Sequence, residues 1–209
     1  AVWSFLLFTG YLKAVEVRHE DGEDLATLVI PNREVASAIR RMVRMWFEDA
    51  AGGTDQLKSL LDALLRGDAP VLERHLARLV STSVSYFDVA APEPERFYHG
   101  LVVGLLAGLG PRYDVRSNRE SGFGRCDVMV LPKQAGQPGV VLELKRVGSD
   151  AGESTEQALT AALRQIRERD YAAELRDRGA APIHEVAAVF EGKRVSVRTG
   201  ALTHGRSVE

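Results

Sequence analysis

Two acidic residues and a lysine stand at a spacing that could support metal-dependent chemistry. Asp127 lies in one segment of β-strand character, and Glu143 and Lys145 lie in the next, within the run LELK. Side chains alternate between the faces of a strand, so Glu143 and Lys145 share a face. If the segments form a hairpin in which Leu131 pairs with Gly139, Asp127 lies opposite Glu143, with Cβ atoms about 4.5–5.5 Å apart. A slip of one residue would turn Asp127 to the other face, so the hypothesis depends on this register.

Two carboxylates this close repel each other unless a cation lies between them. A divalent metal ion and the ammonium group of Lys145 would both relieve that repulsion. Asp127 and Glu143 offer hard oxygen ligands, which suit Mg²⁺ or Mn²⁺ better than zinc. Such a site could activate water for attack on a phosphodiester, while Lys145 orients the water or stabilises the transition state. The alternative is that Glu143 and Lys145 belong to a solvated polar strand face.

Basic residues surround the predicted strands and could neutralise a nucleic-acid backbone, or could be ordinary surface residues. The candidates are Arg116, Arg119, Arg125 and Arg146. The net charge of −2 argues against binding through overall charge, so nucleic-acid binding would need a local basic face. Gln165 lies in the next predicted helix, beside an apolar stripe, and could hydrogen-bond a metal-bound water or a phosphate.

The elements expected to hold these residues follow the order helix, three strands, helix, two strands. Their expected bounds are 95–109 for the first helix, 113–120, 123–131 and 140–147 for the strands, 154–178 for the second helix, and 184–189 and 194–198 for a final hairpin. Gly100, Gly104 and Gly108 form a ridge of small residues on the first helix, which predicts close packing against a neighbouring element. Ser154 and Gln157 match a capping box at the start of the second helix.

The first 92 residues contain a separate set of elements. Alternating apolar residues predict two strands before residue 31, and helical spacing predicts a helix over 34–50. Two amphipathic helices, 54–65 and 70–86, follow a glycine-rich break. We therefore expect a winged-helix-like unit over 1–50 and a helical connector over 51–92, with the run AAPEP marking the boundary.

Composition excludes several classes of protein. The chain has 209 residues, of which 45% are hydrophobic and 27% charged, an ordinary globular balance. Its single cysteine, Cys126, excludes an internal disulfide framework and a cysteine zinc site, so we expect a cytoplasmic protein. No apolar run approaches the roughly 20 residues of a membrane span, so we expect no membrane partner. Because the chain starts abruptly in apolar sequence, we expect it to be a fragment of a longer protein.

Three runs of sequence resemble a known family. They are FYHGL at 97–101, SNRESGFGRCD at 117–127 and LELK at 142–145. Together they closely resemble the C-terminal PD-(D/E)XK nuclease-superfamily domain of bacterial AAA-ATPase-like proteins. Upstream, LFTGYL and IPNREV look like the end of the accompanying ATPase-like region. The chain contains no phosphate-binding GxxxxGK[ST] loop, so we do not expect it to hydrolyse ATP by itself.

The resemblance implies an α/β fold, in which a restriction-endonuclease-like mixed sheet is flanked by helices and preceded by the winged-helix-like and helical region. It places the nuclease-like domain at 93–198 and leaves 199–209 as a C-terminal tail. It also implies that Asp127 and Glu143 are ligands of Mg²⁺ or Mn²⁺ and that Lys145 is the catalytic lysine.

Other residues of the family pattern are matched less closely. Gln165 matches the catalytic glutamine of the helix that follows the core in many members. Tyr171 is six residues further on, instead of the four residues of the common Gln-x-x-x-Tyr form, which puts its role in doubt. Many members add an acidic group from the first helix. Glu95 is the first candidate for this catalytic position, and Glu120 the second. His99 could approach the site or could cap the packing.

The function that the resemblance implies is metal-dependent hydrolysis of nucleic acid, with DNA as the expected substrate, regulated in the full-length protein by an ATPase-like module. The alternative is a catalytically silent module on the same fold that binds nucleic acid or regulates. The helices over 54–86 and the glycine ridge could instead dock the ATPase-like region or a second copy, which would make the protein a homo-oligomer.

Overall fold

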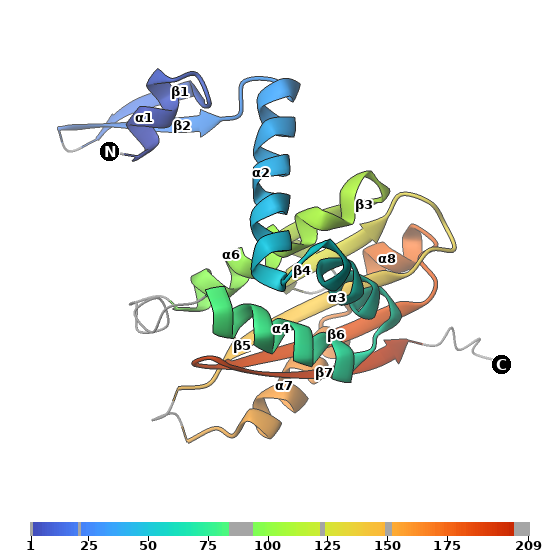
Figure 1. Ribbon diagram of the computed structural model, residues 1–209. Helices are drawn as coiled ribbons and strands as arrows, with labels where there is room; N and C mark the ends of the chain where they lie inside the picture. The colour runs from blue at the N-terminus through green and yellow to red at the C-terminus, as the bar shows by residue number, and fades with distance from the viewer. Residues whose placement is uncertain (1, 21, 84–93, 122–123, 149–151, 203–209) are drawn as a thin grey trace. The chain divides into compact units, whose positions relative to one another are not determined.

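The computed structural model of the chain describes residues 2–20, 22–83, 94–121, 124–148 and 152–202. Its elements are shown in Figure 1. The chain divides into two compact units, Ala1–Met45 and Trp46–Glu209.

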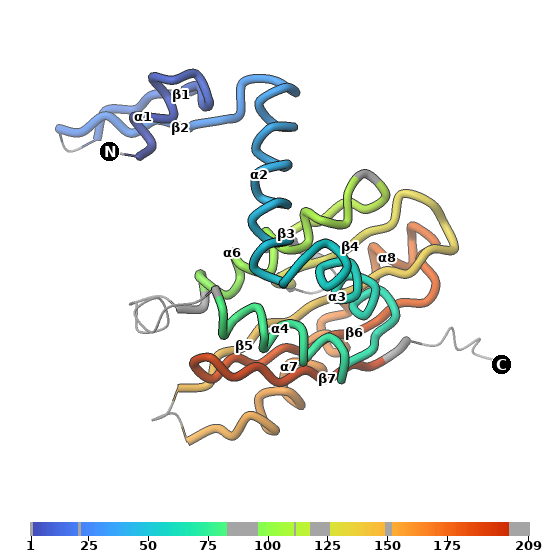
Figure 2. Tube along the Cα trace, in the orientation of Figure 1, coloured from blue at the N-terminus to red at the C-terminus, as the bar shows by residue number. Residues whose placement is uncertain are grey.

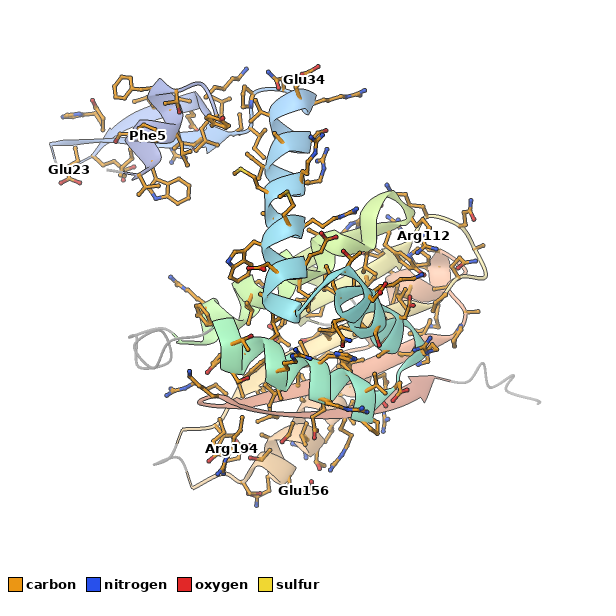
Figure 3. All side chains as sticks on the ribbon, viewed as in Figure 1. Phe5, Glu23, Glu34, Arg112, Glu156 and Arg194 are labelled. Carbon is orange, nitrogen blue, oxygen red and sulfur yellow. The ribbon has the colours of Figure 1, made fainter. Side chains whose placement is uncertain are left out.

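The N-terminal unit contains a short helix, a hairpin and the start of a long helix. These are α1 (Val2–Phe8), β1 (Lys13–Glu20), β2 (Glu23–Val29) and α2 (Arg33–Ala51). Strands β1 and β2 pair antiparallel, and Asn32 Oδ1 accepts the Val35 N–H at 2.8 Å as the cap of α2. None of the described residues of this unit is buried, and Phe5, labelled in Figure 3, is 65% exposed. The order of elements agrees with the prediction, whereas the winged-helix-like assignment and the boundary at residue 50 stay predictions.

The second unit is built on one mixed sheet of five strands in the order β3-β4-β5-β6-β7. The strands are β3 (Tyr113–Ser121), β4 (Gly124–Pro132), β5 (Gly139–Arg146), β6 (Ile183–Glu191) and β7 (Arg194–Leu202). Strands β5 and β6 are parallel, and the other neighbouring pairs are antiparallel. A parallel pair requires a crossover connection. Here the crossover from β5 to β6 contains α7 (Thr155–Glu168) and α8 (Ala173–Asp177), and it can be followed along the Cα trace in Figure 2.

Helices cover both faces of this sheet. On one face, α7 and α8 contribute to a buried cluster that includes Met129, Val141 and Ala187 of the sheet. The other face carries α3 (Thr54–Arg66), α4 (Ala69–Ser83) and α6 (Pro94–Leu106), which continues into the 3₁₀ helix η1 (Ala107–Arg112). The predicted α/β architecture, a mixed sheet flanked by helices, is therefore confirmed.

The ends of α7 differ in how well the sequence predicts them. At its start, Gln157 N donates to Ser154 Oγ at 3.2 Å and Ser154 N donates to Gln157 Oε1 at 2.8 Å, which confirms the capping box. Figure 3 labels Glu156 beside this cap, where its carboxylate pairs with Arg198 of β7 at 2.5 Å. The predicted continuous helix to 178 is wrong, because the chain leaves the helix at Asp170.

Asp170 has a φ of +49°, in the left-handed region that glycine usually occupies at the end of a helix. The Asp170 N–H donates to Arg167 O and the Tyr171 N–H to Ile166 O, each at 3.1 Å. This pair of bonds ends α7 as a Schellman motif does. The turn ends the helix and brings Tyr171 into the buried cluster beneath α7.

The glycine ridge packs closely at one end and is open at the other. A Cβ atom on Gly104 would lie 2.8 Å from the ring of Phe47, whereas one on Gly100 would meet nothing within 4 Å. A Cβ atom on Gly108 would lie 2.9 Å from Leu61 Cδ1 in α3. Close packing is therefore confirmed at the last two glycines.

The last strand is longer than the sequence indicates. Pairing with β6 continues to Leu202, so 199–202 belong to the sheet instead of the predicted tail. Thr199 Oγ1 also donates to Gly67 O at 2.9 Å, which holds this end of β7 against the α3–α4 turn. Residues 203–209 of the predicted tail, and most of the predicted boundary segment 90–94, lie outside the described residues. Within the described ranges, no helix combines the length and apolar character needed to cross a membrane.

Candidate active site

Strands β4 and β5 pair in the register that the candidate site requires. The paired residues are Val128–Leu142, Met129–Val141 and Val130–Val140. Continued one residue beyond each end of this ladder, the register sets Leu131 opposite Gly139 and Asp127 opposite Glu143, in agreement with the register that the sequence hypothesis requires. Because Met129 and Val141 face α7, alternation places Asp127, Glu143 and Lys145 on that face too.

Glu143 is the buried centre of the site. Its carboxylate is only 2% exposed, and Oε1 accepts hydrogen bonds from Gln165 Nε2 at 2.5 Å and from Lys145 Nζ at 3.0 Å. Lys145 Nζ also donates to Gln165 Oε1 at 3.0 Å, which closes a ring of three side chains. We call these three residues the Glu–Lys–Gln ring. Gln165 comes from α7, so the helix delivers its side chain to the sheet face that the sequence predicts.

Asp127 stands beside this ring at the end of the paired region. It is partly buried, and its Oδ2 accepts the backbone N–H of Leu144 at 2.8 Å. Its main-chain carbonyl accepts a hydrogen bond from His99 Nε2 at 3.2 Å. Asp127 is thus held through both its side chain and its backbone.

The electrostatics favour a cation between the two carboxylates. Burial raises the pKa of Glu143 above its ordinary value, and the neighbouring Asp127 carboxylate raises this pKa further. The hydrogen bond and charge of Lys145, together with the backbone amide of Asp127, lower the pKa of Glu143. Glu143 Oε2 is buried and, in the described part of the chain, receives no hydrogen bond. A buried polar atom without a partner is costly, so this oxygen is available to a ligand, as are His184 Nε2 and Glu185 Oε1 elsewhere in the described residues.

The residues fit a divalent cation of the magnesium type. Asp127 and Glu143 supply hard oxygen donors, and Mg²⁺ commonly binds one or two carboxylates and completes its shell with water and phosphate oxygens. The described residues contain no group of three or more His, Cys, Asp or Glu side chains that could hold a metal. Of the described side chains, Asp127 and Glu143 are the two that would hold such an ion, and the buried Glu143 Oε2 receives no hydrogen bond.

The predicted basic residues do not all gather at this site. Arg116 lies on the same face, since it pairs with Met129 in the sheet, but its guanidinium binds Glu174 of α8 at 2.5 Å. Arg146 pairs with Phe190 and turns to the opposite face. There, burial raises the pKa of Tyr98, and the charge of Arg146 offsets part of that rise. Alternation along β5 thus separates Arg146 from Lys145. The side chains of Arg119, Arg125, Glu95 and Glu120 lie outside the described residues.

Two neighbours of the site carry little signal in the sequence. Tyr171 receives a hydrogen bond from Gln165 Nε2 at 3.4 Å, although helical spacing does not place the two residues together. The left-handed turn at Asp170 brings them together, and a turn of this kind without glycine is hard to predict. His99 contacts a backbone carbonyl, and Leu144 contributes its backbone amide. Every residue carries a carbonyl and nearly every residue an amide, so the sequence does not single these contacts out.

Comparison with known proteins agrees with this geometry. Residues 93–199, more than half of the chain, match the model of the PD-(D/E)XK nuclease superfamily. No curated protein matches the chain. The crystal structure of SSO0001 aligns over 61% of each chain with 13% identity and a TM-score of 0.29, which is too low to indicate a shared fold. PD-(D/E)XK nucleases generally use divalent metal ions, in keeping with the fit described above. The chain belongs to the PD-(D/E)XK nuclease superfamily.

Proposed function

We propose that this protein is a metal-dependent nuclease that hydrolyses phosphodiester bonds of nucleic acid, with DNA as its expected substrate. The observation that carries the proposal is the meeting of Asp127 with the Glu–Lys–Gln ring around a buried carboxylate oxygen that lacks a partner. An unpartnered oxygen alone does not single out a metal ligand, because the buried Glu185, which pairs with Arg167, leaves one too. What favours a metal ligand at Glu143 is the second carboxylate, Asp127, and the ammonium of Lys145 beside the Glu143 carboxylate.

Each residue has a role in this proposal. Mg²⁺ or Mn²⁺ held by Asp127 and Glu143 would polarise a phosphate oxygen and lower the pKa of a bound water. Lys145 orients the attacking water and stabilises the negative charge that develops on the phosphate. Gln165 fixes both neighbours, because its carbonyl accepts from the ammonium and its amide nitrogen donates to the carboxylate. In the reaction the attacking water gives a proton to solvent as its oxygen bonds to phosphorus, the ester P–O bond breaks, and the leaving alkoxide takes a proton from solvent.

We further propose that 93–198 is the nuclease domain of a longer protein and that an ATPase-like region regulates it. The support is the resemblance of the segments LFTGYL and IPNREV to the end of such a region. A regulated enzyme would cleave faster when this chain and the separately produced upstream region are combined. Equal cleavage with and without the upstream region would argue against regulation.

One observation favours a second candidate, a catalytically silent module that binds nucleic acid. Lys145 already neutralises Glu143 through a 3.0 Å contact, so the described carboxylate has a cationic partner without any metal. Such a module would bind nucleic acid equally well in EDTA, and Asp127→Asn would leave its affinity unchanged or improve it.

Cleavage of supercoiled plasmid and of labelled single- and double-stranded oligonucleotides separates the two candidates. We expect cleavage with Mg²⁺ or Mn²⁺, none with EDTA, and loss of at least about 100-fold in Asp127→Asn, Glu143→Gln and Lys145→Ala. Lys133→Ala is the matched control, because this lysine lies just beyond β4 and pairs with Asp114 at 3.4 Å, away from the ring. Cleavage that survives in both Asp127→Asn and Lys145→Ala would reject the enzyme, and binding without cleavage would favour the silent module.

A further inference from the structure

The pairing of β4 with β5 stops just before the candidate site. Among the described residues, the last pair at this end of the ladder is Val128 with Leu142. In a regular antiparallel ladder, the N–H of Leu144 would next donate to a backbone carbonyl of β4. It donates instead to Asp127 Oδ2 at 2.8 Å. The side chain of Asp127 thus takes the place of a backbone acceptor where the two strands part.

The main chain of Asp127 is held from the other face of the sheet. His99 Nε2 lies 3.2 Å from the Asp127 carbonyl oxygen. A carbonyl oxygen can only accept, so Nε2 of the imidazole carries the proton in this contact. His99 belongs to α6, which packs on the face opposite α7. It therefore touches the backbone of Asp127 instead of its carboxylate.

The helix that carries His99 is firmly anchored at this point. The preceding residue, Tyr98, is 1% exposed and its hydroxyl donates to Gly192 O at 2.6 Å, in the turn between β6 and β7. Its ring stacks on Phe190, with centroids 4.3 Å apart and an angle of 15° between the planes. After Gly100, the next two residues of the helix, Leu101 and Val102, are also buried. The imidazole thus projects from a fixed part of the helix toward Asp127.

A fixed position for Asp127 is needed because the metal-free carboxylates repel each other. Asp127 and Glu143 carry like charges at neighbouring positions of β4 and β5, so the pair would gain free energy if the Asp127 backbone moved away. The contacts from His99 and from the Leu144 amide oppose that movement. They come from a helix and a strand that are both held by the core, which suits the support of a metal ligand.

We propose that His99 is a positioning residue, which fixes the main chain of Asp127 so that its carboxylate stays beside Glu143. The proposal rests on the proposed function only in taking these carboxylates as a metal site. The geometric part, that His99 controls the placement of Asp127, stands independently of metal binding.

Two readouts test this role, amide hydrogen exchange of Leu144 in the metal-free protein and Mn²⁺ affinity by titration calorimetry. His99→Leu removes the donor at similar volume, whereas the amide of His99→Gln can replace Nε2. We expect His99→Leu to speed exchange at Leu144 by at least about 10-fold and to weaken Mn²⁺ binding by about 10–100-fold. His99→Gln should stay within about 3-fold of the wild type in both readouts. His75→Leu is the matched control, because it removes a histidine contact with Ser59 on helices α3 and α4.

The outcomes separate this proposal from the proposed function. Unchanged Leu144 exchange in folded His99→Leu, or equal losses in the Leu and Gln variants, would overturn the positioning role. If His99→Leu does not fold, His99→Asn takes its place, because its shorter amide does not reach the carbonyl. Wild-type protein that binds no Mn²⁺ would reject the metal site, while the exchange result would still decide the role of His99.

Discussion

Removing the Gln165 amide tests how much the Glu–Lys–Gln ring contributes to the metal-free fold. In Gln165→Leu, the volume under α7 is nearly kept, but Glu143 loses its 2.5 Å hydrogen bond and Lys145 loses a 3.0 Å bond. A hydrogen bond to a charged group contributes about 1.5–3 kcal/mol, and the first of these is buried. The second contributes about 0.5 kcal/mol, because Lys145 is 34% exposed and water competes for its protons. The variant should therefore lose about 2–4 kcal/mol of unfolding free energy.

Urea unfolding in EDTA measures this loss. Gln157→Leu is the matched control on the same helix, since Gln157 makes an exposed capping bond to Ser154 N at 2.8 Å. Its loss should cost only about 0.5–1 kcal/mol. Gln165→Glu adds a third carboxylate, so we expect a larger loss in EDTA and a larger gain with Mn²⁺ than in the wild type.

The reasoning fails if Gln165→Leu costs no more than Gln157→Leu. The ring would then contribute nothing to the fold, and Glu143 would be tolerated in the core by Lys145 alone. It also fails if Gln165→Glu is as stable as the wild type in EDTA, because the repulsion inferred at this site would be absent.

Three further predictions address the same unit. Because the pKa of Glu143 is raised in the folded protein, its contribution to stability is fully present below its ordinary pKa of 4.5 and is lost as the pH rises toward the raised value. The difference in unfolding free energy between wild type and Glu143→Gln, measured in EDTA from pH 4 to 8, should show this decline. A difference that does not change with pH would contradict it. Mn²⁺ at about 100 times its Kd should add about 2.7 kcal/mol, or about 5–10 °C in Tm for a chain of this length, and calorimetry should find no such rise in Asp127→Asn. Gly104→Ala should be about 1–3 kcal/mol less stable than Gly100→Ala, because its Cβ would meet Phe47 at 2.8 Å while that of Gly100 meets nothing; equal thermal stability of the two would refute this packing.

The sequence predicts the features that depend on periodic patterns. The β4–β5 register that the sequence hypothesis requires, with Leu131 opposite Gly139, agrees with the observed pairs, and alternation then places Asp127 and Glu143 on one face as expected. The capping box that starts α7 is equally local. Both depend on residues within one or two neighbouring elements, so the signal is contained in a short stretch of sequence.

Features that depend on distant or backbone partners could not be predicted in this way. Arg116 pairs with Glu174, which lies 58 positions further along the chain, a contact that local patterns do not predict; its role toward nucleic acid stays a prediction. The left-handed Asp170 ends a helix whose apolar pattern favours continuation, and its cost is offset by Schellman-type hydrogen bonds. The acceptor for His99 is a carbonyl that every residue possesses, so only the fold identifies it.

The geometry of Lys145 bears on whether the ring must open before catalysis. An ammonium group has three donors, and the described contacts of Lys145 use two of them, on Glu143 and Gln165. The side chain of Lys145 is also 34% exposed, so the third donor of its ammonium can meet a water or a phosphate oxygen while the other two bonds remain. In the proposed reaction the ring therefore orients Lys145, and its hydrogen bonds need not break before Lys145 contacts the substrate. Substrate would bind to an ammonium that is already oriented, and the free-energy cost of ordering its long side chain would already be met in the folded protein.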